Sequence, residues 1–237
     1  MCNDHARHLS RRSLIASGAT TVLMGGLADA YAQSSPGAAA PAPVSPDDAL
    51  KRLVDGNARY ASNTAINRDM SAGRAERAQA QYPFAALVSC SDSRVAPELA
   101  FDQGPGDLFV VRVAGNFVNT DGLASLEYGV KILGIPLIVV LGHSNCGAVS
   151  ATIKVLKEKT KLPGHLPQLV NAIKPSIDLV EKQKAADPLA AAIAQNVRYN
   201  VGRLRSAKPI VAEAVAAQKV KLAGAVYDIG TGKVSWL

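Results

Sequence analysis

Two cysteines and one histidine occupy positions from which they can bind a metal ion. Cys90 opens the segment Cys-Ser-Asp-Ser-Arg at 90–94, and His143 and Cys146 lie in the segment Gly-His-Ser-Asn-Cys-Gly at 142–147. Two thiolates and one imidazole form a three-ligand set for zinc that leaves a fourth position for water or substrate. Structural zinc sites use four protein ligands, so this set favours a catalytic centre.

The same cysteines also allow two other interpretations, a disulfide and a pair of inert buried thiols. An even number of cysteines and an oxidising compartment are both compatible with a disulfide. A cystine, however, gives no role to His143 or to the charged residues at 92 and 94. A thiol redox protein would be expected to carry a Cys-x-x-Cys pair, which the sequence lacks. Zinc binding is therefore the preferred interpretation.

Asp92 and Arg94 form a second candidate group beside Cys90. Residues two apart in an extended segment point to the same side. Arg94 can then hold the Asp92 carboxylate by two parallel N–H···O bonds. An aspartate held in this way can accept a proton from zinc-bound water and orient the resulting hydroxide. The alternative is an ion pair that only stabilises the turn.

The elements that must position these residues are predicted by apolar runs and turn signals. Strands are expected over 85–89, 108–113, 137–141 and 222–229, with a short edge strand over 233–237. Helices are expected over 122–133, 146–159, 168–183, 188–206 and 209–218, with a short one within 63–81. Strands that alternate with helices predict an α/β fold with a mostly parallel central sheet flanked by helices.

An N-terminal helical extension precedes the first predicted strand. Ser45 is a suitable N-cap, Pro46 suits the first turn, and Asp48 supplies a carboxylate near the free N–H groups. Apolar residues then recur at helical spacing, so this helix is expected to run to about Ser62.

Both candidate groups lie at the carboxyl ends of predicted strands. Cys90 comes one residue after the strand over 85–89, and His143 comes two residues after the strand over 137–141. Binding sites in open parallel sheets form beyond the carboxyl ends of the strands. If the two strands are neighbours, they bring the ligands to the same edge of the sheet.

The first 32 residues have the features of a twin-arginine signal peptide. Ser-Arg-Arg-Ser-Leu-Ile at 10–15 precedes a weakly apolar stretch over 14–27, and Ala-Tyr-Ala at 30–32 offers a cleavage site after Ala32. The apolar stretch is too short for a spanning helix, so we expect no stable membrane insertion after cleavage. A disordered basic N-terminus and an uncleaved anchor are the alternatives. We expect a periplasmic or otherwise exported protein.

The domain organisation and the charge balance follow from composition. Residues 33–44 are rich in Ala and Pro and predict a linker, which leaves 45–237 as the zinc domain. The formal net charge is +7, and without residues 1–32 it is +6, from 23 basic and 17 acidic residues. No basic stripe interleaved with aromatic residues accompanies this excess, so we expect no nucleic-acid partner.

The two site segments together resemble the β-class carbonic anhydrases. The resemblance covers most of 47–237 and includes the segments 56–60, 101–103, 106–116, 125–128 and 227–229. It implies a zinc enzyme that interconverts carbon dioxide and bicarbonate, with one zinc ion per chain. Family members form dimers that often pair into tetramers, so a homodimer or homotetramer is expected.

The resemblance also assigns roles to single residues. Cys90, His143 and Cys146 match the family's zinc ligands, and Asp92 and Arg94 match its catalytic pair. In some members the aspartate closes onto the zinc as a fourth ligand, so Asp92 is a candidate for that role. Gln103 matches a substrate-positioning glutamine; the alternative is a loop amide bonded to the backbone.

Other functions are compatible with the same motifs. A hydrolase of carbonyl sulfide or carbon disulfide would use the same scaffold and differ in its access tunnel. A non-catalytic zinc- or bicarbonate-binding module is less consistent with Asp92 and Arg94. His165, between two prolines, is expected to be an exposed loop residue rather than a proton shuttle.

Overall fold

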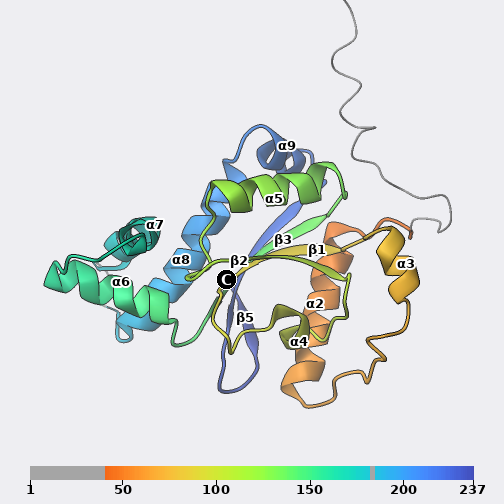
Figure 1. The fold of residues 1–237 in the computed structure, drawn as a ribbon, viewed down its shortest axis with the longest axis horizontal. Helices are drawn as coiled ribbons and strands as arrows, with labels where there is room; N and C mark the ends of the chain where they lie inside the picture. The colour runs from red at the N-terminus through yellow and green to blue at the C-terminus, as the bar shows by residue number, and fades with distance from the viewer. Residues whose placement is uncertain (1–40, 182–184) are drawn as a thin grey trace, which may run out of the picture. The chain divides into compact units, whose positions relative to one another are not determined.

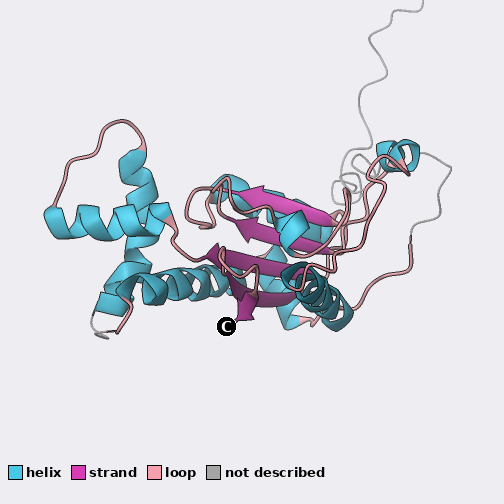
Figure 2. Ribbon diagram, turned by 90° about the horizontal axis from the view of Figure 1, so that it is seen from below, coloured by secondary structure: helices cyan, strands magenta, loops and turns pink. Residues whose placement is uncertain are grey.

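A five-stranded sheet forms the centre of the fold (Figures 1 and 2). The strand order is β2-β1-β3-β4-β5; the first four strands are parallel, and β5 runs antiparallel to β4. The predicted, mostly parallel sheet is thereby confirmed. Strands β1 and β3 are neighbours, which is the condition for their ends to form one site. The strands are β1 (Ala85–Ser89), β2 (Leu108–Arg112), β3 (Leu137–His143), β4 (Lys221–Tyr227) and β5 (Val234–Trp236).

The structure is a computed structural model that describes residues 41–181 and 185–237. The predicted signal peptide over 1–32 and the predicted linker up to residue 40 lie outside the described residues. In the described part, no helix is both long enough and apolar enough to cross a membrane.

Helices cover both faces of the sheet (Figure 1). The buried side chains of α2 and α4 pack on one face, while α5, α8 and α9 pack on the other. Helices α6 and α7 project at the side of the sheet, away from α2 and α3. The helices are α2 (Pro46–Ala61), α3 (Arg74–Gln79), α4 (Pro97–Ala100), α5 (Thr120–Lys131), α6 (Gly147–Glu158), α7 (Leu166–Glu181), α8 (Pro188–Arg205) and α9 (Ile210–Ala216).

Helix α2 begins where its cap signal predicts. The Ser45 hydroxyl accepts the Asp48 N–H at 3.1 Å, and Pro46 opens the helix. Leu53 is fully buried in the core beneath the helix. The side-chain amide of Asn57 donates to the Ala100 carbonyl at 2.8 Å, which fastens the helix to α4.

Several boundaries differ from the prediction for physical reasons. Strand β3 continues two residues further, to His143, because this segment stays paired with β4 up to Tyr227. Helix α5 begins at Thr120 instead of residue 122, because Asn119 caps it by accepting the Gly122 N–H at 2.8 Å. The four-residue helix α4 was not predicted, because it is too short to show a periodic apolar pattern.

Candidate metal centre

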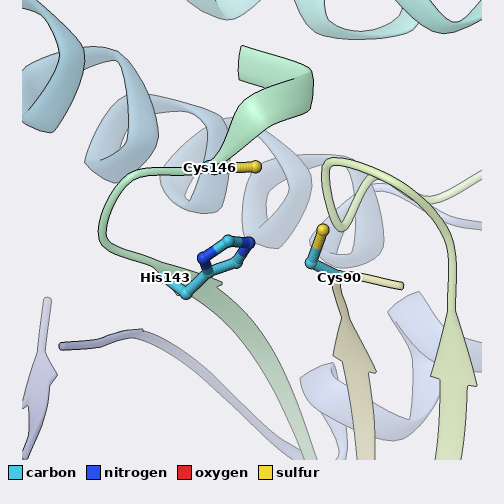
Figure 3. Close-up of side chains that lie close together, drawn as sticks. All are labelled: Cys90, His143 and Cys146. Carbon is cyan, nitrogen blue, oxygen red and sulfur yellow. The ribbon is translucent and has the colours of Figure 1, made fainter. Parts of the chain in front are cut away.

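The side chains of Cys90, His143 and Cys146 converge at the carboxyl ends of β1 and β3 (Figure 3). Cys90 follows β1, His143 is the last residue of β3, and Cys146 is the N-cap of α6. Their ligand atoms all lie within 4.8 Å of one another. The three residues are 3%, 0% and 0% exposed. The juxtaposition expected from the strand ends is therefore present.

The orientation of His143 suits a metal ligand. Its Nδ1 lies 2.9 Å from the Ser144 carbonyl oxygen, which can only accept, so Nδ1 carries the ring proton. Nε2 is buried and has no hydrogen-bond partner among the described residues. Ser144 is itself fixed, since its N–H donates to the Tyr227 carbonyl at 2.8 Å and its hydroxyl accepts the Ile229 N–H at 3.0 Å. A second contact of this kind orients metal-bound histidines.

The two cysteines are free thiols in the structure. The Gly115 N–H donates to Cys90 Sγ at 3.2 Å. Contact with the Cys146 thiol lowers the pKa of Cys90, while the same contact together with burial raises the pKa of Cys146. Two sulfur donors and one unpartnered imidazole nitrogen fit zinc and do not suit calcium or magnesium, which prefer oxygen ligands.

Asp92 and Arg94 form the predicted two-bond ion pair beside this group. Arg94 Nε donates to Asp92 Oδ1 at 2.9 Å, and Nη2 donates to Oδ2 at 2.7 Å. The Arg94 guanidinium holds the pKa of Asp92 well below its ordinary range, and the carboxylate raises the pKa of Arg94. Asp92 Oδ2 lies 3.9 Å from His143 Nε2, so the carboxylate borders the place where the ligand atoms converge.

Arg112 is a site residue that sequence reasoning left without a role. It ends β2, and its guanidinium donates to the Cys90 carbonyl at 3.0 Å and to the Asp92 carbonyl at 2.8 Å. Arg94 makes a longer bond of 3.4 Å to the Asn145 carbonyl. Arg112 thus binds the backbone of the 90–92 segment, and Arg94 links that segment to the backbone between His143 and Cys146. The sequence did offer one signal for this role: Arg112 lies at the carboxyl end of a predicted strand, where the site was expected to form.

Among the described residues, neither Gln103 nor His165 makes a hydrogen bond to Cys90, His143 or Cys146. Gln103 is buried; its amide donates to the Phe101 carbonyl at 2.7 Å and accepts from Arg52 Nε at 3.1 Å. Within the described part of this chain, its amide contacts α2 and its own loop, and its substrate-positioning role stays a prediction. His165 is exposed in the turn before α7, as expected.

Comparisons with known proteins agree on one family. The family model described as carbonic anhydrase matches residues 85–234. A carbonic anhydrase of Mycolicibacterium smegmatis is 40% identical over 190 residues, which cover 80% of this chain and 92% of that protein. The Coccomyxa β-carbonic anhydrase, solved with acetazolamide, is 31% identical with a TM-score of 0.63, covering 79% and 86% of the two chains. A tetrameric β-carbonic anhydrase of Sordaria macrospora shares the fold, with 24% identity, a TM-score of 0.64 and coverage of 79% and 96%.

Proposed function

Because the chain belongs to the carbonic anhydrase family, and to its β class, we propose that Cys90, His143 and Cys146 form its zinc centre. The chain is a zinc enzyme that catalyses the reversible hydration of carbon dioxide to bicarbonate and a proton. One observation carries the assignment of the residues. The buried Nε2 of His143, which has no hydrogen-bond partner in the described part of the chain, faces two free thiols and lies 3.9 Å from Asp92.

The residues around the ligands divide the remaining work. A zinc ion supplies a nucleophile near neutral pH because it lowers the pKa of a coordinated water. The ionised Asp92 carboxylate can only accept hydrogen bonds, so it would orient a water molecule by accepting a hydrogen bond from one of its O–H groups. Arg94 keeps this carboxylate in place through two parallel bonds. With that O–H directed to Asp92, the oxygen of the water would be aimed at the carbon atom of carbon dioxide, and the proton released in forming bicarbonate would pass to solvent.

Neither a hydrolase of carbon–sulfur compounds nor a non-catalytic binding module is favoured for this chain. The comparisons do not favour a hydrolase of carbonyl sulfide or carbon disulfide. A non-catalytic zinc- or bicarbonate-binding module would have no use for a carboxylate held beside the ligand atoms. The intact Asp92–Arg94 pair therefore supports an enzyme.

A pair of histidine variants tests the zinc centre. Purified protein is expected to contain one zinc ion per chain and to hydrate carbon dioxide. His143→Ala should lose both the zinc and the activity, because it removes the only nitrogen donor of the set. His165→Ala is the matched control, since His165 is exposed before α7, and it should keep both. Full zinc content in a folded His143→Ala protein would refute the assignment.

We also propose the export route and the assembly that the sequence predicts. The order of arginine pair, apolar stretch and small-residue site supports a twin-arginine signal peptide cleaved after Ala32 and a periplasmic or otherwise exported zinc domain. The Sordaria macrospora structure is of a tetrameric relative, which supports a homodimer or homotetramer for this chain. Light scattering after gel filtration measures the mass of the assembly, and a monomer at micromolar concentration would contradict it.

A further inference from the structure

Helix α8 presents three polar side chains to the loop that follows β2. Asn196 donates from Nδ2 to the Gly115 carbonyl at 2.8 Å. Asn200 accepts the Val118 N–H at 2.9 Å, and Arg203 donates to the Val118 carbonyl at 2.6 Å. The spacing of four and then three residues places these side chains on one face of the helix. One helix therefore bonds to both ends of the 115–118 segment.

The two asparagines of this polar row are entirely buried. Both are 0% exposed, as is Ser176 of α7, whose hydroxyl donates to Asn196 Oδ1 at 3.2 Å. Asn200 Nδ2 also donates to the Asn196 carbonyl at 2.8 Å. Buried amides are unfavourable unless they are hydrogen-bonded, and asparagine is a poor helix former. Their amides supply partners for backbone groups of the 115–118 segment, which apolar side chains could not do, so the row holds this segment in place.

The far side of the same loop touches the metal centre. The Gly115 N–H donates to Cys90 Sγ at 3.2 Å, while the Gly115 carbonyl accepts from Asn196. Gly115 has φ +83°, and an added Cβ would lie 2.6 Å from Cδ1 of Ile173 on α7. The residue is thus held between α7 and α8, with one backbone group bonded to the helix and the other to the sulfur.

We propose that Asn196, Asn200 and Arg203 are positioning residues that aim the Gly115 N–H at Cys90 Sγ and thereby set the strength of Cys90 as a zinc ligand. An N–H donor stabilises the sulfur lone pairs and fixes the direction of the thiolate. Groups that hold metal ligands from behind affect metal affinity strongly. This inference rests on the proposed zinc centre, because it concerns how one of its ligands is held.

The experiment measures the metal rather than the activity. Asn196→Ala removes the donor to the Gly115 carbonyl and should weaken zinc binding about 10–100-fold in competition with a chelator. With cobalt(II) in place of zinc, the sulfur-to-cobalt charge-transfer band should move to longer wavelength, because a sulfur without its N–H donor releases electrons more easily. A loss of stability alone would not move this band.

A second pair of variants keeps the test decisive if Asn196→Ala does not fold. Arg203→Met removes the exposed end of the row and should shift the band in the same direction by a smaller amount. Arg198→Met is its control, since Arg198 is exposed on the same helix and makes no hydrogen bond to the 115–118 loop within the described residues. An unshifted band and unchanged zinc affinity in the folded row variants would overturn the proposal.

The zinc assignment itself is tested separately by the unsubstituted protein. If its cobalt form showed no thiolate charge-transfer band, the ligand assignment would fail. If the unsubstituted protein showed that band but the row variants did not shift it, the zinc assignment would stand and only the positioning role would fail.

Discussion

At position 92, one aspartate is fixed from both its side chain and its backbone. Arg94 binds the carboxylate, and Arg112 binds the carbonyl of the same residue and that of Cys90. The carboxylate of Asp92 therefore has little freedom to move relative to the Cys90 side chain. Positional precision of this kind matters because hydration depends on the alignment of a single water molecule.

The contribution of Arg112 can be isolated by Arg112→Met. The stem keeps its length, but the bonds to the Cys90 and Asp92 carbonyls are lost. We expect kcat to fall about 10–100-fold from misalignment, while one zinc ion per chain is retained. Steady-state hydration kinetics together with metal analysis make the measurement. Arg205→Met, an exposed arginine at the end of α8, is the control, and equal kcat values in the two variants would exclude a positioning role.

Gly115 and Gly134 form a matched pair for measuring the close packing behind Cys90. Both have positive φ, +83° and +69°. A Cβ at Gly115 would lie 2.6 Å from Ile173, while a Cβ at Gly134 would have no atom of the described residues within 4 Å. Gly115→Ala should therefore lower the free energy of unfolding by about 2–5 kcal/mol, and Gly134→Ala by about 1–2 kcal/mol. Urea denaturation measures both, and similar losses would show that the packing is not tight.

Among the elements, the strands were predicted well because their signal is local. Ala85–Ser89 is buried at every position, and such an uninterrupted apolar run predicts a central parallel strand. The end of β3 was predicted two residues too early, because Gly142 and His143 are not apolar. Their strand conformation comes from pairing with β4, which lies about eighty residues further along the chain.

The candidate site divides in the same way. The thiols, the imidazole and the Asp92–Arg94 pair were predictable, because their residue types and spacing suggest metal chemistry by themselves. The groups that hold them were not predictable, because they depend on contacts between distant segments. Asn196 reaches Gly115 across 81 positions, and no local pattern marks either residue as part of a site.

The end of β4 gives a pH prediction at the scale of an element. Burial, together with the neighbouring Tyr60 hydroxyl 3.3 Å away, raises the pKa of Tyr227 to about 12. The unfolded chain ionises this tyrosine near pH 10. Stability from Tyr227 is therefore fully present below pH 10 and is lost as the pH rises toward 12. Tyr227→Phe should flatten this alkaline loss in urea midpoints, while Tyr82→Phe at a 40% exposed site should leave it unchanged.

For the whole molecule, the proposed export route bears on the state of the thiols. Two zinc thiolates would be carried to an oxidising compartment, where free cysteines tend to pair. A twin-arginine signal carries folded cargo, so zinc can occupy the site before exposure. Replacing residues 1–32 by a leader for unfolded export should lower the zinc content of the exported protein and raise its disulfide content. Equal zinc content by either route would remove this link and leave the ligand assignment intact.

The burial of Cys90, His143 and Cys146 at 0–3% exposure also governs how long a bound ion stays. Water and carbon dioxide are small enough to enter the fourth position, but a chelator has to contact the buried ligand side chains themselves, so metal exchange with it depends on a local opening of the chain. Cys90 follows β1, His143 ends β3 and Cys146 caps α6, so the opening has to separate elements that pack together in the core. The residence time of the metal then reports how often the native state opens locally. It should shorten in variants in which the amides of the first turns of α6 exchange hydrogen faster.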